Sequence, residues 1–184
     1  MHLIDVPVSA WFHARADTAV TAFMLFISQW HSMSGILLMS AILGVILWRA
    51  GQRWWLLSLL LSVPGGLLLN VLVKNIVRRP RPQFEDALLA LKTYSFPSGH
   101  TAGATVFYGF LTLLLFSRVH RKSRRVAIAM SATGIVLLVG LSRIYLGVHY
   151  VTDVAGAIVE GVLWLALCHA GVRALQRRGA GAPG

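Results

Sequence analysis

The sequence predicts an all-α integral membrane protein, folded as a bundle of about six transmembrane helices. Apolar residues make up 57% of the chain and charged residues only 12%, whereas soluble domains average near 45–50% and about 25%. The apolar residues gather in runs that approach or reach the ~20 residues that a spanning helix needs. Basic residues lie in the gaps between the runs, which favours membrane topology over a nucleic-acid-binding surface.

The first apolar segment is the weakest of the six, because it is shorter than a spanning helix. Residues 1–15, which mix apolar and polar side chains, predict an interfacial helix that leads into it and contain no apolar core of a cleavable signal peptide. The third segment contains Pro64, which predicts a kink that neighbouring helices would cover. In chain order the segments are 16–30, 34–48, 54–77, 98–116, 126–145 and 150–170.

We expect one membrane-embedded domain over residues 1–172, because 184 residues are few for two domains. Residues 173–184 are basic and then small, and they predict a disordered cytoplasmic tail. The polar loop 78–97 contains prolines that break a helix, although 87–91 predict a short interfacial one. The single Cys168 excludes a disulfide framework and a cysteine-based metal site.

The distribution of basic residues predicts the orientation. With six spans, ten of them fall on one side, which the positive-inside rule makes cytoplasmic. The loop 78–97 and residues 142–149 then face the periplasm or the exterior. That loop is itself basic, which the rule disfavours on the outer side. Either the predicted orientation is wrong, or the protein needs cations in this loop for its function. The ten residues are Arg49, Arg53, Arg118, Arg121, Lys122, Arg124, Arg125, Arg173, Arg177 and Arg178.

Three clusters of polar residues lie at segment ends on the outward side. They are "KNIVRRPRP" (74–82), which closes the third segment, "PSGH" (97–100), which opens the fourth, and "SRIYLGVHYVTD" (142–153), which joins the fifth to the sixth. Because all three lie at helix ends on one face of the membrane, we expect them to form one site.

The cations in these clusters are suited to binding phosphate. Arginine offers a planar fork that matches phosphate oxygens, and lysine offers a point charge. Ser98 and Gly99, at a helix start, would present a hydroxyl and backbone N–H groups to an anion, aided by the helix dipole. Such a cradle favours the charge-rich transition state of phosphoryl transfer. The cations are Lys74, Arg81 and Arg143.

The clusters also contain a candidate nucleophile and a candidate acid. His149 and Asp153 are four residues apart and share one face of the helix that opens the sixth segment. The carboxylate can hold one imidazole nitrogen and leave the other free to attack. His100 would protonate the leaving oxygen. Together with the three cations, these groups supply the residues that phosphoryl transfer needs, without a metal or a cofactor.

The three clusters resemble the signatures of the type 2 phosphatidic acid phosphatase superfamily, K-x6-RP, PSGH and SR-x5-H-x3-D. All eleven fixed positions match in order, and the motif region covers 74–153. The predicted spans are similar in number to the membrane-bound lipid phosphatase branch, typified by bacterial phosphatidylglycerophosphatase B and undecaprenyl-diphosphate phosphatases. The resemblance implies that His149 attacks phosphorus to form a phosphohistidine, with Asp153 supporting it and His100 acting as the acid. It also implies metal independence and a phosphate site made by Lys74, Arg81, Ser98, Gly99 and Arg143.

Three further charged residues have two interpretations each. Arg78 and Arg79 either lie among lipid headgroups or take part in substrate binding. Glu160 lies within the sixth segment, seven residues after Asp153. An intramembrane carboxylate is a functional candidate, but a hydrogen-bonded structural role is favoured here.

The expected activity is hydrolysis of a lipid phosphate or diphosphate in a bacterial inner membrane, with membrane lipids around it and no nucleic acid or obligatory protein partner. Undecaprenyl diphosphate is favoured as the substrate, because the site is expected to face outward and because the extra arginines, Arg78 and Arg79, could hold a second phosphate. Phosphatidylglycerol phosphate and phosphatidic acid come next. Two alternatives stay open. One is a phosphotransferase that passes the phosphate to another lipid, and the other is a non-enzymatic lipid-phosphate binder or flippase.

Overall fold

Long apolar runs can satisfy their backbone hydrogen bonds inside a bilayer only as helices or closed barrels. A computed structural model describes residues 2–83, 91 and 93–180 of the protein. These residues form helices joined by loops, and none of them forms a strand. The predicted all-α fold is confirmed. The helices are α1 (His2–His13), α2 (Thr18–Trp30), α3 (Met33–Arg49), α4 (Arg53–Val77), α5 (Gly99–Phe116), α6 (Lys122–Tyr145) and α7 (Val151–Ala180).

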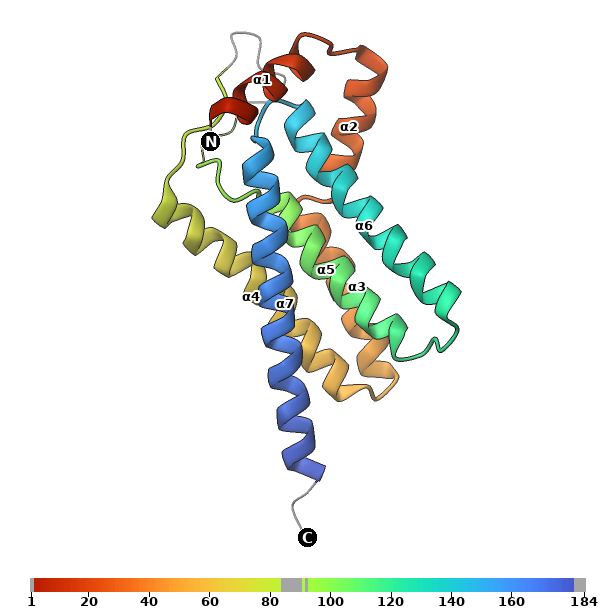
Figure 1. The fold of residues 1–184 in the computed structure, drawn as a ribbon. Coiled ribbons are helices and arrows are strands. Elements are labelled where there is room, and N and C mark those ends of the chain that lie inside the picture. The colour runs from red at the N-terminus through yellow and green to blue at the C-terminus, as the bar shows by residue number, and fades with distance from the viewer. Residues whose placement is uncertain (1, 84–90, 92, 181–184) are drawn as a thin grey trace.

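The described residues contain four or five candidate spans, close to the predicted number of about six. Among the described helices, α4, α5, α6 and α7 are each long and apolar enough to cross a membrane, and α2 with α3 adds a fifth candidate as a pair bent by 51°. The predicted segments 16–30 and 34–48 therefore form one bent path instead of two antiparallel spans. Figure 1 shows α3 continuing away from α2 in the same general direction.

The bend between α2 and α3 is held by His31, a buried residue. Its Nδ1 lies 2.8 Å from the carbonyl oxygen of Ile27, and its Nε2 lies 2.9 Å from the hydroxyl of Tyr108 on α5. Ser32 then caps α3 by accepting a hydrogen bond from the backbone N–H of Gly35. Because these side chains satisfy polar groups at the break, the path can bend within an apolar environment.

Helix α5 is the central helix and packs against α3, α4, α6 and α7. Glycines allow this close packing. A methyl group at Gly103 would contact the side chains of Leu67 and Ile36, and one at Gly161 on α7 would lie within 2.9 Å of the Cβ of Thr105. Small residues at helix contacts bring backbones together where no hydrophobic force drives association in lipid.

Helix α4 continues through Pro64 as one element. Trp164 of α7 lies against Gly65 and Gly66, and its Nε1 donates a hydrogen bond to the carbonyl oxygen of Ser62 at 3.0 Å. A neighbouring helix thus covers the backbone next to the proline, as the sequence predicted.

The outer surface of the bundle is apolar. Large hydrophobic side chains stand exposed along the long helices, in numbers that a water-soluble surface does not show. This surface and the candidate spans make the chain an integral membrane protein. Examples are Leu60, Leu68, Ile76, Met130, Leu163 and Leu167.

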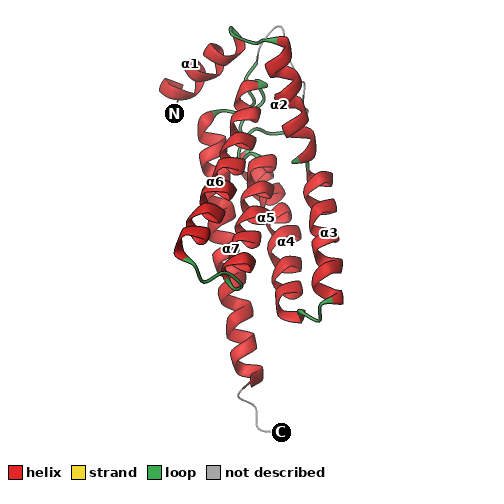
Figure 2. Cartoon of the chain, turned by 90° about the vertical axis from the view of Figure 1, so that its right-hand side faces the viewer, coloured by secondary structure: helices red, strands yellow, loops and turns green. Residues whose placement is uncertain are grey.

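The helix ends form two groups. Figures 1 and 2 show α1 at one end of the bundle, where α4 and α6 end and α5 and α7 begin. The opposite end collects the end of α3, the start of α4, the turn from α5 to α6 and the end of α7. Since α2 and α3 make one path, α1 lies at the end that contains the three sequence clusters.

The helix α7 corrects one prediction. Residues 173–180, expected to be disordered, continue α7 to Ala180. Alanine, leucine, glutamine and arginine favour helix strongly, so a polar end does not stop one. Residues 181–184 and nearly all of the short helix predicted at 87–91 lie outside the described residues.

Candidate active site

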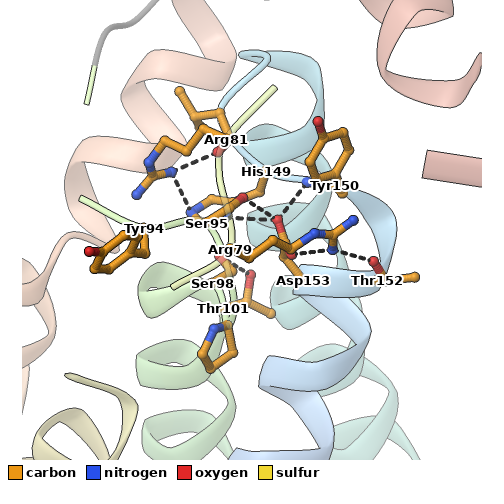
Figure 3. Close-up of polar contacts among 12 residues, drawn as sticks. Arg79, Arg81, Tyr94, Ser95, Ser98, Thr101, His149, Tyr150, Thr152 and Asp153 are labelled. Atoms are coloured by element: carbon orange, nitrogen blue, oxygen red, sulfur yellow. Dashed lines mark hydrogen bonds and ion pairs between the residues drawn. The ribbon is translucent and has the colours of Figure 1, made fainter. Parts of the chain in front are cut away.

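The three sequence clusters meet at the α1 end of the bundle, where Figure 3 shows their polar contacts. Nη1 of Arg81, in the loop after α4, lies 3.2 Å from Nε2 of His149, in the turn between α6 and α7. The backbone N–H of Ser98, at the start of α5, donates to the carbonyl oxygen of Asp153 at 3.2 Å. Segments distant in the sequence therefore form one site.

The turn after α6 presents His149. Gly147 has φ +70°, a conformation that side-chain-bearing residues rarely adopt, and it reverses the chain directly after the helix. The backbone N–H groups of Val148 and His149 both donate to the carbonyl oxygen of Arg143, at 3.2 and 3.3 Å. Local backbone bonds thereby fix the position of the imidazole relative to Arg143.

The two nitrogens of His149 face groups of opposite charge. Nδ1 lies 3.5 Å from Oδ2 of Asp153, an ion-pair distance that is long for a hydrogen bond. Nε2 faces Arg81 at 3.2 Å. Because a guanidinium only donates, Nε2 is assigned as the unprotonated acceptor and Nδ1 as the proton carrier. Burial lowers the pKa of His149 from 6.5 to about 3, so the imidazole is neutral near pH 7.

Asp153 is fully buried and accepts hydrogen bonds from three further groups. Arg79 Nη1 donates to Oδ1 at 2.6 Å, and the backbone N–H of Tyr150 donates to Oδ2 at 2.9 Å. The hydroxyl of Ser95 also donates to Oδ2. These three hydrogen bonds hold the carboxylate in place independently of its contact with the imidazole.

A second buried carboxylate, Asp5 of α1, joins this network. It accepts from Arg79 Nη2 at 2.6 Å and from the backbone and hydroxyl of Thr152 at 3.1 and 2.6 Å. Burial opposes ionisation of Asp5, but its hydrogen bonds with Thr152 and Arg79 outweigh burial and lower its pKa. Likewise the two carboxylates outweigh burial at Arg79 and raise its pKa.

Two predicted phosphate ligands are anchored by neutral oxygens. Lys74 Nζ donates to the carbonyl oxygens of Tyr94 and Pro97, at 2.8 and 2.9 Å. Arg81 donates to the carbonyl oxygens of Thr93 and Val148, at 2.7 and 2.6 Å. Carbonyl oxygens orient these cations without cancelling their charge.

Arg143 is 1% exposed and is the largest of the fully buried side chains that the structure describes. Its Nη1 donates to the hydroxyl of Ser28 on α2, whereas its Nε has no hydrogen-bond partner among the described residues. Within the part of the chain that the structure describes, no carboxylate forms an ion pair with Arg143, Arg81 or Lys74. A buried guanidinium with an unpartnered N–H fits an anion such as phosphate.

The start of α5 places the PSGH residues beside these cations. Ser98 is fully buried, and its Oγ accepts a hydrogen bond from Thr101 Oγ1 at 3.0 Å. The α-carbon of Gly99 lies so close to Asn70 that an added methyl group would be 3.2 Å from Oδ1. His100 lies in the first turn, within electrostatic range of Arg143, His149 and Arg81.

The three accessory candidates take different positions. Arg79 bridges the two carboxylates, whereas Arg78 is exposed, adopts φ +51° and ends α4 with its Nε donating to the carbonyl oxygen of Asn75. Glu160 accepts a hydrogen bond from Asn70 Nδ2 at 2.8 Å, and its Oε1 has no partner among the described residues. The favoured structural interpretation of Glu160 agrees with this contact.

Sequence reasoning missed several residues of the site. Asp5 gave one weak signal, since it is a lone carboxylate in an amphipathic stretch, but nothing indicated which end of the bundle that stretch occupies. Ser95 lies two residues before a recognised cluster, and proximity could have suggested it. The missed residues are Asp5, Ser28, Thr93, Ser95 and Thr152.

A family comparison agrees with the site. Residues 55–177 match the PAP2 superfamily, a stretch that includes all three clusters. The chain belongs to the PAP2 superfamily. The resemblance drawn from the motifs is thereby confirmed.

Two named phosphatases and one solved structure are similar to the chain. Phosphatidylglycerophosphatase B of Bacillus subtilis (strain 168) is 33% identical over 141 residues, covering 76% of this chain and 69% of that protein. Undecaprenyl-diphosphatase BcrC of the same organism is 28% identical over 154 residues, covering 80% of this chain and 72% of that one. The crystal structure of a transmembrane PAP2 type phosphatidylglycerolphosphate phosphatase from Bacillus subtilis has a TM-score of 0.81 at 29% identity, covering 94% of this chain and 84% of that one.

The PAP2 family and these relatives support a phosphatase of the hydrolase class. Together with the apolar helices, they make the chain an integral membrane member of a lipid phosphatase family.

Proposed function

We propose that the chain hydrolyses a lipid phosphate through a phosphohistidine on His149. The observation that supports this proposal is that the two ring nitrogens of His149 face groups of opposite charge. Asp153 lies on the Nδ1 side at 3.5 Å, and the lone pair of Nε2 points toward Arg81 at 3.2 Å. A phosphate bound among the cations would therefore meet the nucleophilic nitrogen directly.

The proposed reaction has two steps. In the first, Nε2 of His149 bonds to phosphorus, the bond from phosphorus to the lipid oxygen breaks, and His100 gives that oxygen a proton. In the second, a water molecule loses a proton to His100 and attacks phosphorus, and the phosphorus–nitrogen bond breaks. Inorganic phosphate leaves, and both histidines return to their starting protonation states.

Phosphate binding is assigned to the cations and the start of α5. Arg143 is buried, its Nε has no hydrogen-bond partner among the described residues, and the backbone N–H groups at the start of α5 add the positive end of the helix dipole. These groups would stabilise the developing negative charge in the transition state, a task that a divalent metal performs in other phosphatases. We therefore propose metal-independent catalysis. The phosphate ligands are Lys74, Arg81, Ser98, Gly99 and Arg143.

The structure changes the order of candidate substrates. The sequence favours a diphosphate because the site faces outward and because Arg78 and Arg79 could hold a second phosphate, but in the structure Arg79 is bound to two carboxylates and Arg78 ends α4. The outward-facing site alone does not select a diphosphate, and similarity to phosphatidylglycerophosphatase B of Bacillus subtilis favours phosphatidylglycerol phosphate. Undecaprenyl diphosphate follows, supported by similarity to undecaprenyl-diphosphatase BcrC, and phosphatidic acid comes next.

We propose that the active-site end faces the periplasm or exterior of a bacterial inner membrane and that the C-terminus is cytoplasmic. The ten basic residues identified from the sequence lie in the elements that meet at the opposite end. Single cysteines test this orientation, because the native Cys168 is buried. An impermeant maleimide added to intact cells should label Arg15→Cys and spare Ser123→Cys, and the reverse pattern would overturn the orientation.

The central experiment measures free phosphate released by the purified protein from phosphatidylglycerol phosphate, undecaprenyl diphosphate, phosphatidic acid and a lipid A diphosphate. We expect release to persist in excess EDTA and to fall at least about 1000-fold in His149→Ala. The control is His120→Ala, which changes an exposed histidine in the loop between α5 and α6 and should leave release unchanged. Equal release by His149→Ala would overturn the assigned nucleophile.

Two alternatives give different results. A phosphotransferase shares the first step, so a suitable lipid acceptor would reduce free phosphate while phosphorylated acceptor accumulates. A binder or flippase would retain its function in His149→Ala and release no phosphate from any lipid. An acid-labile label on the wild-type protein that is absent from His149→Ala would support the phosphohistidine.

A further inference from the structure

The end of the bundle opposite the active site contains a cavity of about 690 Å³. It lies among the start of α4, the end of α5, the start of α6 and the end of α7, at the lower end of Figure 1. Its volume is in the range of sites that hold small molecules or lipid headgroups. None of the proposed active-site residues lines this cavity.

Three arginines from three helices line the cavity: Arg53 of α4, Arg125 of α6 and Arg173 of α7. None of the lining residues is acidic. The guanidinium of Arg125 is pre-positioned, because its Nε and Nη2 donate to the carbonyl oxygens of Val119 and Phe116, both at 2.9 Å. Convergent arginines without a carboxylate make a site for an anion.

The acidic residues that the structure describes are engaged elsewhere. Asp5 and Asp153 pair with Arg79, Asp17 caps α2, and Glu160 bonds to Asn70. No described carboxylate is therefore placed to neutralise the cavity.

A buried polar group also lines the cavity. Ser58 of α4 is 2% exposed, and its Oγ has no hydrogen-bond partner among the described residues. A buried hydroxyl without a partner is costly, and a ligand oxygen would satisfy it. Beside it, the ring of Trp55 stacks on His169 with 5.9 Å between centroids and 30° between planes.

The rest of the wall includes the apolar Trp54, Leu113 and Val172, together with the polar Gln52, Ser117 and Gln176. The cavity thus combines three cations from helix ends with aromatic and aliphatic surface. Tryptophan and arginine at the ends of transmembrane helices lie at the depth of lipid headgroups. A ligand with a charged head and an apolar tail fits both parts of the wall.

We propose that this cavity binds the phosphate headgroup of an anionic phospholipid from the leaflet opposite the active site. Arg53, Arg125 and Arg173 bind the phosphate oxygens, Ser58 donates its hydroxyl, and the lipid tails follow the apolar wall. The site is separate from the catalytic one and does not depend on the proposed reaction. A soluble phosphate ester shares the headgroup chemistry but would leave the apolar wall unused.

The test measures binding of phosphatidylglycerol to delipidated full-length protein by native mass spectrometry. His149→Ala serves as the background, so that the active site is the same in every sample. We expect Arg53→Gln with Arg173→Gln to weaken one binding event about 10-fold or more. The control pair, Arg49→Gln with Arg177→Gln, removes two arginines from the same end that do not line the cavity, and should bind as the background does.

Further arms identify the ligand. Phosphatidylcholine should bind more weakly than phosphatidylglycerol at the affected site, and inorganic phosphate or glycerol phosphate should compete only at far higher concentration. If the control pair weakens phosphatidylglycerol binding equally, the effect comes from general surface charge, and the proposal is overturned. Equal competition by a soluble phosphate would overturn the lipid assignment. The cavity variants are also made with His149 intact, and phosphate release at the wild-type rate would confirm that they fold. If release is lost, the unfolding temperature of each variant would show whether it is folded.

Discussion

Asp5 and Asp153, near opposite ends of the chain, accept hydrogen bonds from two nitrogens of the same guanidinium, that of Arg79. Both distances are 2.6 Å, and both carboxylates are fully buried. The helix α1 is thereby connected through one side chain to the carboxylate that faces His149. This connection makes the position of Asp153 sensitive to residues that lie outside the three sequence clusters.

Asp5→Asn should lower kcat on the order of 10-fold with little change in KM, because it weakens the bridge that orients Asp153 without touching the phosphate ligands. Steady-state kinetics of phosphate release would measure both constants. The control is Asp17→Asn, which keeps a capping side-chain oxygen on α2, should change the free energy of unfolding by less than about 1 kcal/mol and should retain kcat. Unchanged kcat in Asp5→Asn would assign Asp5 a structural role only.

Adjacent arginines should differ in their contribution to stability. Arg79→Gln leaves two buried carboxylates without their cation, which we expect to cost about 3 kcal/mol and most of the activity. Arg78→Gln changes an exposed side chain at the end of α4 and should cost less than about 1 kcal/mol. Denaturant unfolding of the two variants in the same detergent would compare them. Equal effects would show that Arg79 acts only as one more surface charge.

The imidazole of His149, which lies between α6 and α7, should stay neutral across the working pH range. Burial lowers its pKa from 6.5 to about 3. In nuclear magnetic resonance spectra of histidine-labelled protein, the signal absent from His149→Gln should therefore show no protonation between about pH 8 and pH 5. A titration of that signal near pH 6.5 would contradict the burial argument.

The same pKa difference has a consequence for stability. Above pH 6.5 His149 is neutral in both the folded and the unfolded chain, so it makes no pH-dependent contribution. As the pH falls below 6.5, His149 becomes protonated in the unfolded chain but stays neutral in the folded chain until about pH 3. The free energy of unfolding therefore decreases as the pH falls through that interval. The free-energy difference between wild type and His149→Gln should consequently shift against wild type by about 2 kcal/mol between pH 7 and pH 5. A constant difference would contradict the prediction.

Two glycines of α7 offer a matched test of helix packing. A methyl group at Gly161 would lie 2.8 Å from Cγ2 and 2.9 Å from Cβ of Thr105, whereas none of the described atoms lies within 4 Å of one at Gly171. Gly161→Ala should therefore destabilise the protein by about 1–3 kcal/mol. Gly171→Ala should be neutral or slightly stabilising, because alanine favours helix over glycine. Thermal unfolding of both variants would decide, and equal unfolding temperatures would contradict the close contact of α5 with α7.

Much of the site could be predicted from the sequence, because its main residues lie in short, spaced clusters at helix ends. Arg81, Ser98, His149 and Asp153 meet as expected, since helices that begin or end at one membrane face bring their termini together. The supporting residues could not be predicted in the same way. Ser95 reaches the site from the loop between α4 and α5, and Thr152, at the start of α7, joins it only because Arg79 and Asp5 fold against that helix; neither arrangement has a periodic signal in the sequence.

The sequence by itself determined the membrane environment, the helical fold and the family, and it supplied the residues on which the proposed chemistry rests, because apolar run length, charge placement and local spacing act through adjacent residues. Only the tertiary structure decided that α2 and α3 form one bent path, which places α1 and Asp5 at the active-site end. Only it decided that Arg79 binds two carboxylates and that three arginines converge on a cavity at the other end. These relationships depend on which helices pack side by side, and that is set by contacts between residues far apart in the chain.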